Sequence, residues 1–199
     1  MEKPRHAPLV QFPILDDELV VGGLRLRELA DRVGQTPFYA YDRSAIATRI
    51  ALLRATLPAG LSLHYAIKAN PMPDLVREMV ALVDGFDVAS AGELNLAIDS
   101  GMDPGAVSFA GPGKTPLELR QAVATGVVIN LESDLELTRV IEVGATLGKR
   151  PRVALRVNPN FELKSSGMQM AGGPKPFGID VEQLPAVLAR LTSADIEFL

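Results

Sequence analysis

Short apolar runs alternate with amphipathic stretches from residue 61 onward, at a spacing of roughly twenty residues. The first four runs read LSLHYAI, GFDVA, AVSFAG and VVINLE, RVALRVN follows at residue 152, and SADIEFL at residue 193 begins a sixth. Strands that alternate with helices pair in parallel, because each helix carries the chain back to the start of the next strand. The sequence therefore predicts an α/β protein, either a doubly wound open sheet or a (β/α)8 barrel.

Capping signals mark where the predicted helices begin and end. Three S/T-x-x-E capping boxes stand between an apolar run and the amphipathic stretch after it, namely Ser90 with Glu93, Thr115 with Glu118, and Ser133 with Glu136. Asn70 and Pro71 suit the start of the first helix. Gly101, Gly126 and Gly148 stand where helices should stop. For Glu93, the capping role alone is a sufficient explanation.

The N-terminal part of the chain shows a different organisation. Residues 1–35 are expected to form an extension with a short helix in LRLRELADRVGQ, and residues 36–199 to form the barrel segment. TPFYAYD predicts a strand and RSAIATRIALLRATL a helix. A complete (β/α)8 barrel takes about 250 residues. We therefore expect a barrel truncated after five to six β/α units, without its C-terminal half.

Composition excludes several classes of function. With a net charge of −4 and 20 scattered Lys and Arg residues, the chain has no basic patch, so we expect no nucleic-acid partner. It has no cysteine and only His6 and His64, which argues against a zinc cluster. No apolar run reaches the length of a membrane span, and the N-terminus lacks the apolar core of a signal peptide. We expect a cytoplasmic protein with no membrane contact.

Two stretches of the sequence can be compared with nucleotide-binding motifs, and neither matches. SFAGPGKT, residues 108–115, ends like a phosphate-binding loop, but Ser108 stands where the first glycine is required. The dinucleotide-binding G-x-G-x-x-G is also missing after the first strand, where the sequence reads IKANPMP. Neither nucleotide hydrolysis nor dinucleotide binding is expected.

The stretch HYAIKAN raises the question of Lys68, which follows an apolar run. A buried ammonium is costly, so a lysine there is exposed, paired, deprotonated or covalently engaged. Strand alternation puts Lys68 on one face with Ala66. By the same alternation Asp87 and Arg156 end their strands above small alanines, and we expect these charged groups to meet at the barrel mouth rather than to be exposed. A purely structural ion-pair network is the alternative.

Further polar side chains follow the other strands. They share a position at the carboxyl edge of the expected sheet, and they are Asn70, Ser90, Lys114, Asn130, Glu132 and Asn158. Sites are built at this edge in both architectures. The long segment NPNFELKSSGMQMAGGPKPFGID has no clear period, which is typical of a lid or a binding loop.

Taken together, these motifs resemble the fold type III decarboxylases that depend on pyridoxal 5′-phosphate (PLP), which include the ornithine and diaminopimelate decarboxylases. The resemblance rests on TPFYAYD, HYAIKANP, GFDVASAGEL, FAGPGK, ALRVNPN and FGID, in that order along the chain. It covers the family's N-terminal half. The loop GMQMAGGPKPFGID is most similar to the decarboxylase-like group associated with exosortases. The resemblance implies an alanine racemase-like TIM-type barrel.

The resemblance also implies roles for individual residues. Lys68 corresponds to the lysine that forms the internal aldimine with PLP. Ala66, Asp87, Glu93 and Arg156 correspond to residues that bind or adjoin the cofactor. Family members commonly carry KFG where this chain has Pro176 before Phe177, which puts an ion pair formed by that lysine in doubt.

The implied function is decarboxylation of an amino acid of the diaminopimelate or ornithine class, with homodimers whose active sites draw on both chains. The family's stacking histidine, glycine-rich phosphate site and C-terminal β domain fall beyond residue 199, so this chain alone is expected to be inactive. A PLP-dependent racemase and a noncatalytic PLP-binding barrel are the alternatives. Release of carbon dioxide separates the first two, and a bound chromophore without turnover defines the third.

Overall fold

The computed structural model describes residues 11–161 and 175–199. The chain divides into two compact units, Met1–Leu61 and Ser62–Leu199. The sequence placed the domain boundary at residue 35, whereas the structure groups residues 36–61 with the N-terminal unit. The assignment of these residues to the barrel domain stays a prediction.

The N-terminal unit contains a small antiparallel sheet that the sequence analysis missed. Its strands are β1 (Ile14–Leu15), β2 (Glu18–Val21) and β3 (Leu24–Arg25). Helix α1 (Leu26–Val33) follows within the predicted stretch, and α2 (Arg43–Thr56) is also confirmed. The strand predicted in TPFYAYD is wrong: residues 36–42 pair with no strand in the described part of the chain. An extended segment needs a neighbour for its backbone groups before it becomes a strand.

Helix α2 begins at a well-defined cap. Asp42 Oδ1 accepts hydrogen bonds from the backbone N–H groups of Ser44 at 2.8 Å and Ala45 at 3.3 Å. The hydroxyl of Ser44 also donates to Oδ1 at 2.6 Å. This hydroxyl is the largest influence that lowers the pKa of Asp42, and the backbone donors act in the same direction. The carboxylate form that caps the helix is thereby favoured.

The C-terminal unit is built on one six-stranded parallel sheet. Its strands in spatial order are β11 (Glu197–Phe198), β8 (Arg152–Leu155), β7 (Val128–Leu131), β6 (Val107–Phe109), β5 (Gly85–Val88) and β4 (His64–Ala66). A second, short parallel pair joins β9 (Val157–Asn158) to β10 (Ile179–Asp180). The predicted strand RVALRVN is thus broken at Arg156, where β8 ends and β9 has not begun.

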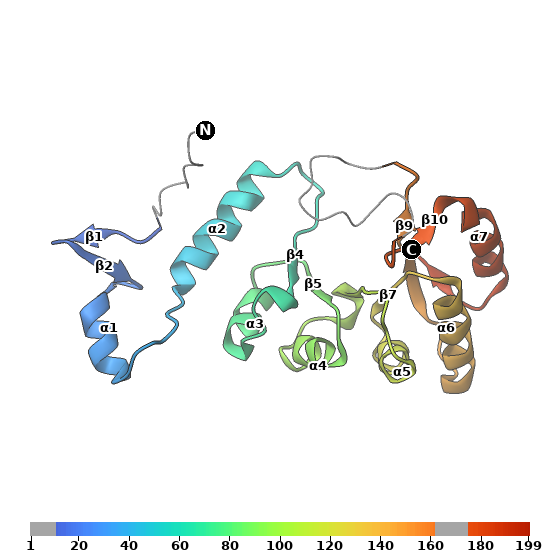
Figure 1. The fold of residues 1–199 in the computed structure, drawn as a ribbon, viewed down its shortest axis with the longest axis horizontal. Coiled ribbons are helices and arrows are strands. Elements are labelled where there is room, and N and C mark those ends of the chain that lie inside the picture. The colour runs from blue at the N-terminus through green and yellow to red at the C-terminus, as the bar shows by residue number, and fades with distance from the viewer. Residues whose placement is uncertain (1–10, 162–174) are drawn as a thin grey trace. The chain divides into compact units, whose positions relative to one another are not determined.

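Helices connect the strands in the order that the sequence predicted. They are η1 (Ile67–Ala69), α3 (Pro73–Val80), α4 (Ala91–Asp99), η2 (Pro104–Ala106), α5 (Pro116–Thr125), α6 (Asp134–Leu147), η3 (Val181–Gln183) and α7 (Leu184–Ser193). Figure 1 shows α3, α4, α5 and α6 in a row along one face of the sheet. Strands in sequence order with their helices on one face define part of a (β/α)8 barrel, since a doubly wound sheet reverses its strand order.

The predicted capping residues begin three of these helices. Ser90, Thr115 and Ser133 cap α4, α5 and α6. Only Thr115 and Glu118 form the complete reciprocal box. Glu93 and Glu136 reach one residue further back, to the backbone N–H groups of Ala89 and Glu132, each at 2.9 Å.

The start predicted for the first helix of this unit needs correction. Helix α3 starts at Pro73, not at Pro71, and Asn70 Oδ1 accepts a hydrogen bond from the N–H of Met72 at 3.1 Å, before the helix begins. Two of the three predicted stop glycines, Gly126 and Gly148, are left-handed caps, whereas α4 is capped by Ser100 with Gly101 following.

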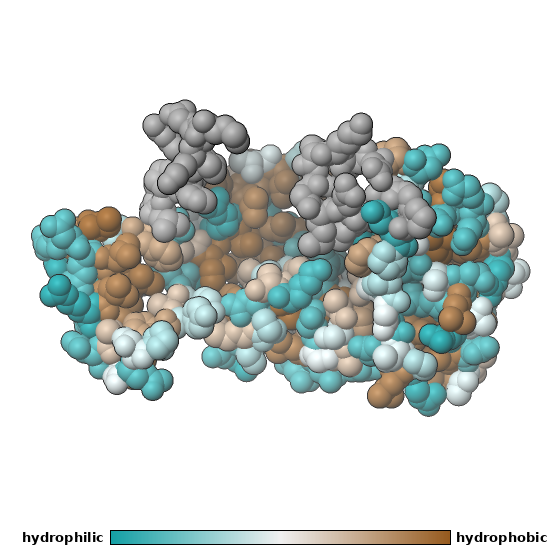
Figure 2. Space-filling model, in the orientation of Figure 1, coloured by the Kyte–Doolittle hydropathy of each residue, from teal (hydrophilic) through white to brown (hydrophobic). Residues whose placement is uncertain are grey.

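Large apolar side chains fill the space on the helical side of the sheet. The fully buried ones include Phe86, Phe109, Ile129, Leu131 and Val153 from the strands. Burial of each such side chain contributes about 1.5–3 kcal/mol to folding. Figure 2 shows hydrophilic residues spread over the visible surface of this unit, with brown apolar residues between them. In residues 11–161 and 175–199, no helix combines the length and apolar character that a membrane crossing requires.

Candidate active site

The strand register brings polar and small residues together on the face of the sheet away from the strand residues of the core. Ala66, Asp87 and Ser108 are register partners on β4, β5 and β6. Side chains two residues apart on a strand point to the same face. Ala89 and Ala110 therefore follow Asp87 and Ser108 on this face, and Asn130 of β7 lies on it as well. Together they line a hollow of about 220 Å³ at the carboxyl edge of the sheet. Its full lining is Ala66, Lys68, Asp87, Val88, Ala89, Ser108, Ala110 and Asn130.

Lys68 lines this hollow from the 3₁₀ turn η1, not from a strand. Strand β4 ends at Ala66, and the turn buries Ile67 completely while it leaves Lys68 exposed. The sequence analysis expected Lys68 not to be exposed, and this expectation is wrong for the described chain. Lys68 therefore does not end a strand as predicted, but Lys68 and Asp87 do line the same hollow.

Asp87 lines the hollow with its side chain half exposed. His64 Nδ1 lies 3.5 Å from Asp87 Oδ1. His64 is two residues before Ala66 on β4 and therefore shares its face of the sheet. On the far side of the hollow, Asn130 Nδ2 donates to Ser108 Oγ at 2.6 Å. The sequence analysis missed Ser108 as a lining residue, although the period-2 pattern of AVSFAG puts it on the same face as Ala110.

Glu93 and Arg156 do not line the hollow. Glu93 is held at the start of α4, where its Oε2 accepts from the N–H of Ala89, a lining residue. Arg156 lies beyond β8 and donates from Nη1 to both carboxylate oxygens of Glu132, at 3.3 and 3.2 Å. Of the five residues that the resemblance assigns to the cofactor, Ala66, Lys68 and Asp87 line the hollow, as does Asn130 from the further polar residues expected at this edge.

A buried ion pair adjoins Glu132. Lys114 Nζ lies 3.1 Å from Glu136 Oε1, with the two side chains only 1% and 6% exposed. Lys114 also donates to the carbonyl oxygens of Gly111 at 2.7 Å and Asn130 at 2.8 Å. Burial raises the pKa of Glu136, and the positive charge of Lys114 opposes this shift.

The same contacts bear on the segment 108–115, whose sequence ends like a phosphate-binding loop. Every contact of Lys114 described above is internal, so its ammonium is not presented to a ligand. The expectation that this segment binds no nucleotide stays a prediction. Within the described residues, no group of three metal-ligating side chains is assembled either.

The geometry described so far defines an α/β-barrel domain with a lysine and an aspartate at the carboxyl edge of its parallel strands. The family model of the pyridoxal-binding domain of pyridoxal-dependent decarboxylases matches residues 43–199. The chain therefore belongs to this family of decarboxylases, whose cofactor is PLP.

Named relatives and solved structures agree with this assignment. Diaminopimelate decarboxylase from Aquifex aeolicus is 39% identical over 170 residues, covering 84% of this chain and 40% of the relative. L-glutamyl-[BtrI acyl-carrier protein] decarboxylase from Niallia circulans is 36% identical over 160 residues, covering 80% of this chain and 37% of the relative. The crystal structure of a diaminopimelate decarboxylase variant from Helicobacter pylori with L-lysine matches at a TM-score of 0.78 and 26% identity, covering 87% and 45% of the two chains. This chain thus spans under half of the length of each relative.

The residues of the hollow fit one wall of a PLP site. Lys68 presents an accessible amine, and Ala66, Ala89 and Ala110 leave room above the sheet. The hollow is smaller than the roughly 300–1,000 Å³ of a typical enclosed ligand pocket, as expected where only part of the wall is supplied. The resemblance to the exosortase-associated group rested on residues 167–180, of which 167–174 lie outside the described residues, as does most of the predicted lid.

Proposed function

We propose that the protein takes part in PLP-dependent decarboxylation of an amino acid, with Lys68 as the residue that carries the cofactor. The observation that supports this most is the placement of Lys68 and Asp87 in one hollow at the carboxyl edge of strands β4 and β5. In β/α barrels, active sites lie at this edge. The family of the domain supplies the reaction class.

Bound PLP would supply the electron sink for the charge left when the substrate's carboxylate departs. For this chain's own residues we propose separate tasks. Lys68 holds the cofactor through its amine, which must be neutral to attack. Asp87 places a carboxylate beside that amine, and Ala66 leaves space. Glu93 fixes the backbone at Ala89, and Arg156 supplies a cation near the edge.

The substrate, the assembly and the compartment are also proposals. We infer a substrate of the diaminopimelate or ornithine class, because the relatives named above act on diaminopimelate or a glutamyl group. A homodimer and a cytoplasmic location remain predictions from the family resemblance and from composition.

The proposed reaction is tested with the complete gene product, PLP and carboxyl-labelled amino acids. Diaminopimelate and ornithine are offered separately, with their D- and L-forms resolved by chromatography. We expect release of labelled carbon dioxide and formation of the corresponding amine. Inversion of the α-carbon without carbon dioxide would replace decarboxylation by racemisation. A PLP chromophore that persists without turnover would make the protein a noncatalytic PLP-binding barrel.

A further inference from the structure

Arg156 is held by groups from two separate segments of the C-terminal unit, one at the end of β7 and one at the start of β10. Its backbone N–H donates to Leu131 O on β7 at 3.0 Å, and its carbonyl oxygen accepts from the N–H of Ile179 on β10 at 2.8 Å. Its side chain meets Glu132, which follows β7, and Phe177, which precedes β10. A surface ion pair holds an arginine through its charged end alone. The partly exposed Arg156 is held through its backbone and through two side-chain contacts.

The first constraint on the guanidinium is a buried carboxylate. The Glu132 side chain is 1% exposed, and a buried charge persists only when it is paired and hydrogen-bonded. Besides Arg156 Nη1, Glu132 Oε1 accepts the N–H of Gly111 at 2.5 Å. The backbone N–H of Glu132 is in turn held by Glu136, the partner of Lys114. The carboxylate that faces Arg156 is therefore fixed at both its head and its backbone.

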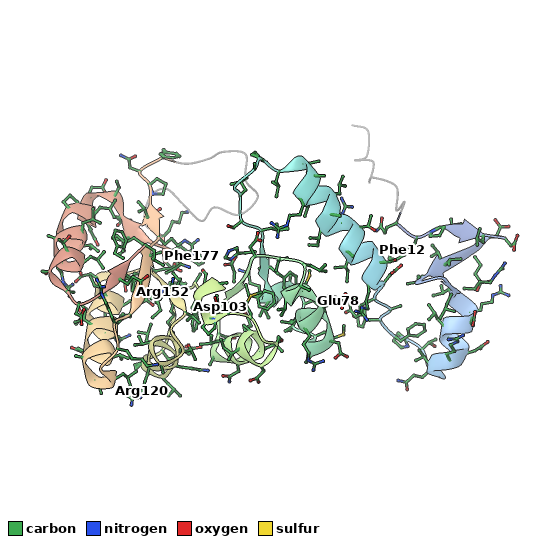
Figure 3. The ribbon with its side chains drawn as sticks, turned by 180° about the vertical axis from the view of Figure 1, so that it is seen from behind. Phe12, Glu78, Asp103, Arg120, Arg152 and Phe177 are labelled. Atoms are coloured by element: carbon green, nitrogen blue, oxygen red, sulfur yellow. The ribbon has the colours of Figure 1, made fainter. Side chains whose placement is uncertain are left out.

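The second constraint is an aromatic ring. The Phe177 ring lies with its centroid 4.8 Å from Arg156 Cζ, a cation–π contact. The next residue, Gly178, lets its backbone approach that of Arg156: its φ is +82°, and a Cβ there would meet the carbonyl oxygen of Arg156 at 2.9 Å. Because Arg156 directly follows the last residue of β8, the ring lies at the end of this strand opposite to Arg152, and Figure 3 shows Phe177 above Arg152.

We infer that Glu132 and Phe177 are positioning residues that clamp the Arg156 guanidinium in one orientation at the carboxyl edge. This inference rests on the proposed function, because it assigns Arg156 to cofactor or substrate. The carboxylate fixes one nitrogen, Nη1, and the ring fixes the plane. An arginine held in this way meets an anionic group without losing side-chain freedom at that moment. Neither Glu132 nor Phe177 needs to touch that group.

The test is a double-mutant cycle on the complete gene product, with kcat/KM expressed per PLP site. Sites are counted as the pyridoxyl adduct formed by borohydride, so loss of folded protein does not enter the result. We expect Glu132→Gln and Phe177→Leu each to lower kcat/KM about 10–100-fold, as loss of orientation does. In an Arg156→Met background both substitutions should have almost no further effect. Phe177→Tyr keeps the ring and should restore activity.

Asp134→Asn is the matched control, because it removes an exposed carboxylate at the start of α6 that pairs with Arg190 of α7 and not with Arg156. It should leave kcat/KM per site unchanged. The inference is overturned if Glu132→Gln and Phe177→Leu keep wild-type kcat/KM per site, or if their effects are as large in the Arg156→Met background. Release of carbon dioxide by the wild type reports on the proposed function separately. If the wild type turns over substrate but the effects in the double-mutant cycle are additive, the clamp is rejected and the proposed function stands. Without turnover, both proposals fall.

Discussion

Replacement of Lys68 by arginine is expected to abolish the PLP chromophore and to lower turnover on the order of 10³-fold or more. The guanidinium keeps the positive charge, but its pKa is so high that it stays protonated and offers no neutral amine to bond the cofactor's aldehyde. Since Lys68 is exposed on the 3₁₀ turn η1, the substitution should leave the fold intact. Absorbance of the cofactor, substrate turnover and thermal unfolding are measured on the same preparation.

Lys149→Arg provides the control for this substitution. Lys149 is also an exposed lysine, but it donates to the carbonyl oxygen of Ala124 and does not line the hollow. Its variant should bind PLP and turn over substrate like the wild type. A Lys68→Arg protein that retains the chromophore and turnover would show that another residue carries the cofactor.

Replacement of Lys114 by methionine is expected to lower the free energy of unfolding by about 3–5 kcal/mol. The change leaves the Glu136 carboxylate and the carbonyl oxygens of Gly111 and Asn130 without their buried cation. Urea unfolding measures the loss. Lys149→Met, which removes an exposed lysine, should cost less than about 1 kcal/mol.

The loss should depend on pH in a defined direction. Burial already raises the pKa of Glu136 above its reference value of 4.5, and without Lys114 it should rise further. A carboxyl group with a raised pKa in the folded state stabilises the fold below its unfolded pKa and loses that contribution as pH rises through its folded pKa. The Lys114→Met protein should therefore be least destabilised near pH 4.5 and more destabilised at neutral pH.

A second substitution tests the cause of this instability. Glu136→Gln in the Lys114→Met protein removes the unpaired charge, so it should recover part of the lost free energy and flatten the pH dependence. A Lys114→Met protein as stable as the wild type at neutral pH, or one that gains stability as pH rises from 4.5, would contradict this account of the pair.

The order of strands and the helix starts were predictable because their signals are local. Ser90, Thr115 and Ser133 sit beside the hydrogen bonds they satisfy, and the apolar runs show the strands directly. The small sheet β1–β3 was missed, since its strands are two to four residues long and give almost no period. The sequence signal for this sheet was in its two turns, where Asp16–Asp17 and Gly22–Gly23 adopt positive φ angles.

The site was predictable where alternation along a strand decides it, and not where contacts join distant segments. Alternation placed Ala66 and Asp87 correctly on one face. It failed for Lys68, because a 3₁₀ turn replaces the end of the strand. The capping box explained Glu136 so fully that its ion pair with Lys114, 22 residues away, left no trace in the pattern. The contact of Phe177 with Arg156 likewise depends on the return of a loop.

The central claim is that Lys68 carries the cofactor at the carboxyl edge of the sheet. The direct measurement is to incubate the complete gene product with PLP, reduce it with borohydride, digest it and locate the pyridoxyl group by mass spectrometry. The account predicts one modified residue, Lys68, with Lys114, Lys149 and Lys175 unmodified in the same digest. A pyridoxyl group absent from Lys68, or spread evenly over the lysines, would contradict it.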